Sequence, residues 1–142
     1  MKSVSTALAL LIAITWSSAL AAQCRSNEVL VDEDKDNYYC KDRAEHAQCI
    51  RNTGLQLRQD RQACASRVQL VFTDARTGLS NAALSCVAGC LGNGLTVRGC
   101  LSSCGIGAVY PVQVLEKAVD ETNSCLGQAL IADKRRVEAC KR

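Results

Sequence analysis

His46 is the single histidine of the chain, and histidine is the side chain that most readily carries protons near neutral pH. Asp42 precedes it by one helical turn and Cys49 follows it by three residues, so an Asp–His pair is within reach on a helix. A small secreted hydrolase using His46 is therefore one hypothesis. We expect a surface or capping role instead, because no serine-centred elbow, phosphate loop or pair of catalytic carboxylates accompanies it.

An acidic run, Asp32-Glu33-Asp34-Lys35-Asp36-Asn37, places aspartate at alternate positions, as the first three oxygen ligands of a helix–loop–helix calcium site do. The match then fails. Such a loop requires glycine at its sixth position and glutamate at its twelfth, which are Asn37 and Arg43 here. We expect a solvated acidic loop, no bound calcium and no other cofactor.

Ten cysteines are present, and all follow residue 22. An even number of cysteines in a short exported chain is typical of a disulfide framework. Zinc is the alternative, but a single histidine and the absence of Cys-x2-Cys spacing do not favour it. If every cysteine is bonded, no free thiol is left to act as a nucleophile.

Two Cys-x3-Cys pairs flank a turn-rich segment, residues 91–96. On helices the two thiols of each pair lie one turn apart on one face, so an antiparallel hairpin joins Cys90 to Cys100 and Cys86 to Cys104. Cys64 with Cys125 and Cys49 with Cys140 continue the nesting, because the residue numbers of each pair add to nearly the same value, and Cys24 and Cys40 are left to pair with each other. The predicted disulfides are Cys24–Cys40, Cys49–Cys140, Cys64–Cys125, Cys86–Cys104 and Cys90–Cys100.

Helix geometry disfavours the local alternatives to this pairing. Cys49 and Cys64 are 15 residues apart, as are Cys125 and Cys140. On a continuous helix that spacing is a rise of about 22 Å, whereas bonded Cα atoms lie within about 7 Å of each other. A helix break at Gly54 or Gly127 would make the local pairs accessible again.

Residues 1–22 have the pattern of a cleaved signal peptide: a positive Lys2, an apolar segment from Ala7 to Trp16, and small residues before Gln23. Gln23 occupies the place of the small residue expected before a lipidated cysteine, which disfavours lipidation of Cys24. We expect a secreted or periplasmic protein. Its organisation would be signal peptide 1-22, an extended segment 23-40 closed by a disulfide, and a helical disulfide-linked domain 41-142.

The charge balance indicates no nucleic-acid partner. Residues 1–22 carry Lys2 as their one charge, so their removal leaves 16 basic and 14 acidic residues. The acidic residues gather near the start of the mature chain and the basic ones near its end, which is typical of solvated faces. A protein partner or self-association is the expected interaction, and a membrane surface is the less favoured one.

The remaining pattern predicts a mainly α fold with a small N-terminal β-hairpin. Strands at residues 28–31 and 38–39 would flank a loop too long for a tight turn. Small and apolar residues then recur every three or four positions from Cys40 to Phe72, with a bend at 52–54. Connectors are expected at 74–78 and 105–110. Short helices carry the two Cys-x3-Cys pairs, the first capped by Ser80 or Asn81.

A second long helical segment begins with Pro111 in its first turn and continues to Cys140, interrupted only at Gly127. The whole would be a disulfide-stapled antiparallel helical bundle. We expect the connectors to fold the short hairpin back on the long arms as a four-helix-like bundle, since this buries more apolar surface than a straight rod.

The twin Cys-x3-Cys hairpin, Cys86 to Cys104, is similar to the short disulfide-linked helical hairpins of several unrelated families. These include small mitochondrial intermembrane-space chaperones and plant hairpin peptides. The resemblance implies a cross-linked helical hairpin over about 19 residues. It carries no function, because the leader and the outer cysteines depart from both families.

Segment 79–115 is apolar and rich in glycine, and Arg98 is its one charge. Such a hairpin raises the alternative of a membrane-active or toxin-like protein. Neither half supplies an apolar span near 20 residues, so we favour a buried hairpin. The leading prediction is an exported, non-enzymatic, disulfide-rich binding or structural module of the envelope or secreted space.

Overall fold

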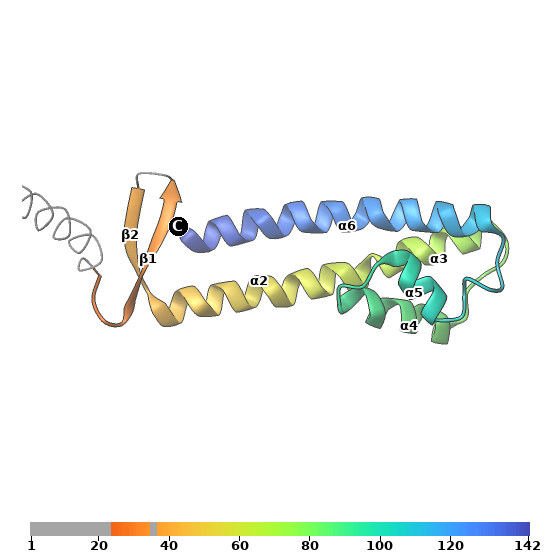
Figure 1. Cartoon of the computed structure of the whole chain (residues 1–142), viewed down its shortest axis with the longest axis horizontal. Helices are drawn as coiled ribbons and strands as arrows, with labels where there is room; N and C mark the ends of the chain where they lie inside the picture. The colour runs from red at the N-terminus through yellow and green to blue at the C-terminus, as the bar shows by residue number, and fades with distance from the viewer. Residues whose placement is uncertain (1–23, 35–36) are drawn as a thin grey trace, which may run out of the picture. The chain divides into compact units, whose positions relative to one another are not determined.

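A computed structural model describes residues 24–34 and 37–142 (Figure 1). The predicted signal peptide lies outside the described residues, as do Lys35 and Asp36 of the acidic run. The elements are β1 (Glu28–Asp34), β2 (Asn37–Asp42), α2 (Arg43–Ala63), α3 (Ala65–Asp74), α4 (Asn81–Gly92), α5 (Val97–Ser103) and α6 (Val112–Lys141). The predicted mainly α fold with a small N-terminal sheet is confirmed.

Two compact units make up the chain. The described part of the first comprises residues 24–34 and 37–49 with Cys140–Arg142, and the second is Ile50–Ala139. Helices α2 and α6 each contribute residues to both units.

The first unit is built on the antiparallel pair β1 and β2, in which Leu30 faces Cys40. The Cys24–Cys40 disulfide closes this segment. The expected long loop is wrong, because the strands run to Asp34 and resume at Asn37. An irregular register between Asp32 and Asp34 accommodates one extra residue, as a β-bulge does, so the ladder extends into the acidic run.

Helix α2 begins at a side-chain cap supplied by Asp42. Its Oδ1 accepts hydrogen bonds from the backbone N–H groups of Ala44 at 2.9 Å and Glu45 at 3.0 Å. A carboxylate in this position satisfies donors that have no partner inside the helix. The Cys49–Cys140 disulfide, with Cα atoms 5.7 Å apart, completes the unit.

The predicted bend at 52–54 is wrong, because α2 continues unbroken through Gly54 to Ala63. A glycine costs a helix only about 1 kcal/mol relative to alanine, and a helix of 21 residues absorbs that cost. The interruption occurs instead at Cys64, which separates α2 from α3 and is bonded to Cys125. Helix α6 likewise passes through Gly127 without a break.

The ends of the short helices follow the local sequence. Ser80 Oγ accepts from the Ala83 N–H at 3.2 Å, so the predicted cap of α4 is confirmed. Thr96 does the same for α5. Pro111 lies one residue before α6 and not in its first turn, and its carbonyl accepts from the N–H of Leu115 at 3.2 Å. Proline suits this place because it has no N–H to leave unpaired.

One hydrophobic core fills the second unit, and helices α3, α4, α5 and α6 all contribute to it. Its buried members are Ala65, Val68, Val71, Phe72, Leu79, Val87, Leu91, Val97, Cys100, Leu101, Ile106 and Ala118. In Figure 1, α4 lies beside α3, and α5 packs on α4. This packing confirms the expected fold-back of the short hairpin.

An aromatic contact joins α3 to the connector that precedes α6. The rings of Phe72 and Tyr110 meet edge to face with centroids 4.5 Å apart, a favoured arrangement for aromatic pairs. The Tyr110 hydroxyl also donates to the Gly78 carbonyl at 2.9 Å. The chain entering α4 and the chain entering α6 are therefore tied together.

The turn between α4 and α5 packs closely on α2. Arg58 donates to the Asn93 side-chain oxygen at 3.2 Å. A Cβ atom added at Gly94 would lie 2.6 Å from Arg61 Nη1, and one added at Gly92 would lie 2.7 Å from Gln62 Cγ. These two glycines therefore allow the turn to approach α2.

The five disulfides are those that the spacing predicts, with Cα–Cα distances of 5.4–5.9 Å. All ten cysteines lie in the described part of the chain, and none of them is free. No helix among the described residues has both the length and the apolar character needed to span a bilayer.

Candidate functional site

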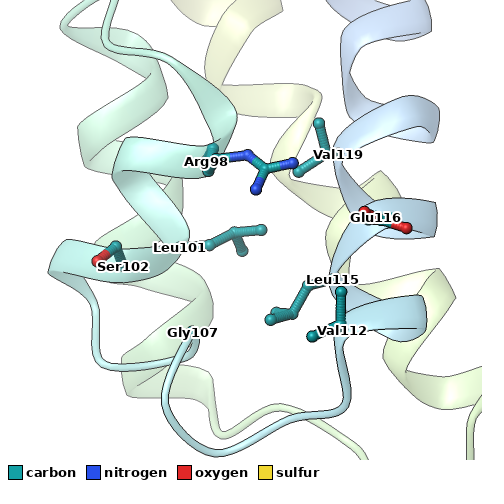
Figure 2. Close-up of a pocket in the computed structure, with 8 residues that line it drawn as sticks. All are labelled: Arg98, Leu101, Ser102, Gly107, Val112, Leu115, Glu116 and Val119. Carbon is teal, nitrogen blue, oxygen red and sulfur yellow. The ribbon is translucent and has the colours of Figure 1, made fainter.

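A small open cleft lies between α5 and the start of α6, within the second unit (Figure 2). Its volume is about 200 Å³. The residues that line it are Arg98, Leu101, Ser102, Gly107, Val112, Leu115, Glu116 and Val119. Its lining combines apolar side chains with charged groups.

Disulfides fix the α5 wall of this cleft. Cys90–Cys100 and Cys86–Cys104 join α5 to α4, and Cys100 is completely buried. A cross-link within this helix of seven residues and another at its C-cap, Cys104, leave it little freedom to rotate or slide. The wall is therefore held in place before any ligand binds, which lowers the entropy cost of binding.

The loop that follows α5 turns the chain toward α6. Gly105 adopts a positive φ of 75°, which glycine tolerates far better than residues with a side chain. The Leu101 carbonyl then accepts from the N–H groups of Ile106 at 2.9 Å and Gly107 at 3.2 Å. This turn brings Gly107 against Ser102 at the edge of the cleft.

Aliphatic side chains form the floor. Leu101 and Leu115 point into the cleft from opposite helices, and Val112 lies beside Leu115 in Figure 2. Leu101 is buried, whereas the side chain of Val112 stands at the edge and the residue is 63% exposed. The floor thus continues outward as accessible apolar surface.

One charge of each sign stands on the lining. Figure 2 shows Arg98 reaching from α5 toward Val119, while Glu116 lies on α6. Among the described residues, neither side chain takes part in an ion pair or a side-chain hydrogen bond. Both charges are therefore available to a ligand.

The size of the cleft restricts what it can hold. Sites for drug-sized molecules and cofactors have volumes of about 300–1,000 Å³, and an engineered apolar cavity of about 150 Å³ binds benzene. A cleft of about 200 Å³ lies between these limits. It fits one aliphatic or aromatic group and not a whole cofactor.

His46 lies in the first unit and contacts the end of α6. Its Nδ1 lies 3.3 Å from the Cys140 carbonyl oxygen, to which Lys41 Nζ also donates at 2.8 Å. Histidine and lysine side chains near the C-terminus of a helix can hydrogen-bond its last carbonyl groups. The Asp42 carboxylate caps α2 through Oδ1 and accepts from Asn27 through Oδ2. The contacts of both residues support the expected capping role of His46 and not an Asp–His pair.

The side chains of the acidic run, residues 32–37, lie outside the described part of the structure, and the expectation about calcium with them. One compact group of potential metal ligands occurs among the described residues, namely Cys24, Glu28 and Cys40, whose ligand atoms lie within 4.8 Å of one another. Its two sulfur atoms are bonded to each other. They therefore offer no thiolate to a metal.

The apolar segment 79–115 supplies much of the core. Six of its larger aliphatic residues are buried: Leu79, Val87, Leu91, Val97, Leu101 and Ile106. Leu95 and Val109 are exposed. The buried-hairpin expectation is confirmed for these six residues, and Val112, at the start of α6, is exposed as well.

Sequence reasoning singled out Arg98 but not the cleft around it. Glu116 and Val119 lie outside segment 79–115 and belong to a different helix. The isolated charge at Arg98 was the one available signal.

The chain matches no protein-family model, no curated protein and no solved structure.

Proposed function

We propose that the protein is a non-enzymatic binding module of an oxidising, extracytoplasmic compartment that holds a partner polypeptide by one aliphatic side chain. The cleft between α5 and α6 receives that side chain. The observation that carries the proposal is an open cleft lined by Leu101 and Leu115, whose α5 wall is fixed by two disulfides. Buried side-chain anchors of this kind dominate the affinity of many protein interfaces.

The compartment follows from the cysteine chemistry. Five disulfides without a free thiol suit an oxidising environment, since cytosolic thiols are kept reduced. Export by the predicted signal peptide, residues 1–22, would deliver the chain to the periplasm or the secreted space.

The alternatives have less support. A membrane-active hairpin needs exposed apolar surface, yet six of the twelve large aliphatic residues of segment 79–115 are buried and only three are exposed. A hydrolase using His46 needs a partner for the ring, and Asp42 is engaged as a helix cap. The cleft between α5 and α6 offers apolar surface together with one charge of each sign.

A titration of the isotopically labelled, disulfide-bonded chain tests the proposal by NMR. The probe is N-acetyl-L-leucinamide, a neutral molecule with one aliphatic side chain, and N-acetylglycinamide is the matched probe without it. We expect saturable shifts of the Leu101 and Leu115 methyl signals with the leucine probe alone. Equal shifts with both probes, or shifts spread over the surface, would contradict the proposal.

Val112→Asp is the variant that tests the position of the site. It puts a carboxylate on the lining without disturbing the buried core, because Val112 is 63% exposed. We expect it to weaken binding of the leucine probe about tenfold, since an unpaired charge next to an apolar ligand is costly. Val109→Asp is the control, because Val109 is exposed in the loop before α6 but does not line the cleft.

A further inference from the structure

Arg98 brings a cation to the cleft, and it forms no ion pair with Glu116, the carboxylate on the opposite wall. It is the single charged residue of segment 79–115, and its side chain has no ion pair with any residue that the structure describes. Charges attract more strongly beside apolar surface than in bulk water. The planar guanidinium fork also matches a carboxylate through two parallel hydrogen bonds. The chemistry of the cleft therefore favours a ligand that carries a carboxylate.

Glu116 orients such a ligand from the opposite helix. Its carboxylate repels a second carboxylate and accepts hydrogen bonds from an N–H group. A ligand that satisfies the lining therefore presents a carboxylate to Arg98, an N–H to Glu116 and an aliphatic group to the floor. In a polypeptide these three groups are attached to one carbon atom at the carboxyl-terminal residue and nowhere else.

We propose that the cleft binds the carboxyl-terminal aliphatic residue of a partner polypeptide. Arg98 binds its α-carboxylate and Glu116 accepts its amide N–H, while its side chain lies on Leu101 and Leu115. The inference rests on the proposed function, and it adds the chemical class of the partner. A fatty acid is a poorer match, because about 200 Å³ holds one short aliphatic group and not a long chain.

The surroundings of the cleft favour a polypeptide over a free amino acid. Val109 and Val112, in the loop and at the start of α6, are 73% and 63% exposed. Val112 lines the edge of the cleft, and Val109, three residues earlier, is a further exposed apolar side chain outside it. A chain that continues from its terminal residue can cover this surface, whereas a free amino acid leaves it in water.

Three probes of equal side chain and different charge test the inference on the disulfide-bonded chain. N-acetyl-L-leucine carries the carboxylate, N-acetyl-L-leucinamide is its neutral counterpart, and L-leucine has a free ammonium group. We expect N-acetyl-L-leucine to bind about tenfold more tightly than the neutral probe, the range of one charge-assisted bidentate contact. L-Leucine should bind no more tightly than N-acetyl-L-leucine.

Variants of Arg98 assign the preference to one side chain. Arg98→Gln should remove the preference for the carboxylate while leaving the affinity for the neutral probe within about twofold, because the apolar floor is unchanged. Arg98→Lys should keep part of the preference, since the charge remains without the fork. Arg135→Gln is the control, as Arg135 is exposed on α6 and does not line the cleft.

The outcomes separate the two proposals. Equal affinity for N-acetyl-L-leucine and its amide would overturn the carboxyl-terminal inference and leave the proposed function standing. The absence of shifts at Leu101 and Leu115 with any probe would overturn both. Tighter binding of L-leucine than of N-acetyl-L-leucine would show that the occupant is a free amino acid. Loss of neutral-probe binding in Arg98→Gln, with an unchanged circular dichroism spectrum, would also count against the assignment.

Discussion

Arg136 of α6 donates to the carboxylate of Asp60 of α2 over 2.7 Å, and both side chains are about 30% exposed or less. Gln56 donates to the other oxygen of the same carboxylate at 3.1 Å. The contact joins α2 and α6 inside the second unit. In sequence, Asp60 precedes Cys64 and Arg136 follows Cys125, the two cysteines of one disulfide. The contact therefore supplies a polar link where the described helices bury few apolar residues.

This contact makes the free energy of unfolding depend on pH. The hydrogen bonds from Gln56 and Arg136, together with the charge of Arg136, hold the pKa of Asp60 below its usual value, although partial burial opposes them. The pKa of Asp60 is lower in the folded protein than in the unfolded chain. The ionised carboxylate therefore stabilises the folded protein at pH values above the unfolded-state pKa. This stabilisation is lost as the pH falls through the folded-state pKa, because the carboxylate is then protonated. Asp60→Asn should cost about 0.5–1 kcal/mol near neutral pH and almost nothing in strong acid.

Urea unfolding of the oxidised protein at the two pH values measures that difference. Lys117→Gln is the control, because the Lys117–Asp74 pair is 3.7 Å apart and mostly exposed. It should change stability by less than about 0.5 kcal/mol. A cost of Asp60→Asn that persists unchanged in acid would show that charge is not its cause.

The Cys64–Cys125 bond is expected to contribute more to stability than the Cys86–Cys104 bond. It spans 61 residues, against 18 for the inner bond. Constraint of the unfolded chain gives about 4 kcal/mol for the longer loop and about 3 kcal/mol or less for the shorter one. Cys64 is also buried, whereas Cys86 is exposed.

Paired serine substitutions at each bond, compared by urea unfolding, measure these contributions. Peptide mass spectrometry of the two variants should show that the four remaining disulfides are unchanged. A larger loss of stability on removal of Cys86–Cys104 would contradict the expected order.

Glycines in the long helices and in the turns should respond oppositely to alanine. Gly54 lies in α2 with no atom within 4 Å of an added Cβ, so Gly54→Ala should stabilise by about 0.5–1 kcal/mol. Gly94 has a positive φ of 82°, so Gly94→Ala should destabilise by about 1–2 kcal/mol. Thermal unfolding of both variants tests the pair, and a stabilising Gly94→Ala would refute the turn geometry.

The disulfide pairing and the helix caps could be predicted because each depends on local geometry. A regular rise per residue sets which of two cysteines on facing helices can meet, so Cys64 with Cys125 follows from spacing. Ser80 caps α4 by accepting a hydrogen bond from the N–H of Ala83, and this spacing of three residues can be read directly from the sequence.

Other features depend on free-energy differences and tertiary contacts that the sequence pattern does not show. The cost of Gly54 is small beside the length of α2, so the helix continues. The cleft depends on the turn at Gly105, which brings Glu116 to the same hollow as Arg98. Two charges on different helices have no spacing rule to join them.

The outermost helical cross-link, Cys49–Cys140, encloses most of the chain. A single peptide bond cut anywhere between these two residues leaves one cysteine of the pair on each fragment. The fragments therefore stay one covalent molecule, whichever connector a protease attacks. In a compartment that contains proteases, a single cut in the loop near Gly78 or in the loop near Val109 would leave two fragments that remain joined by this disulfide.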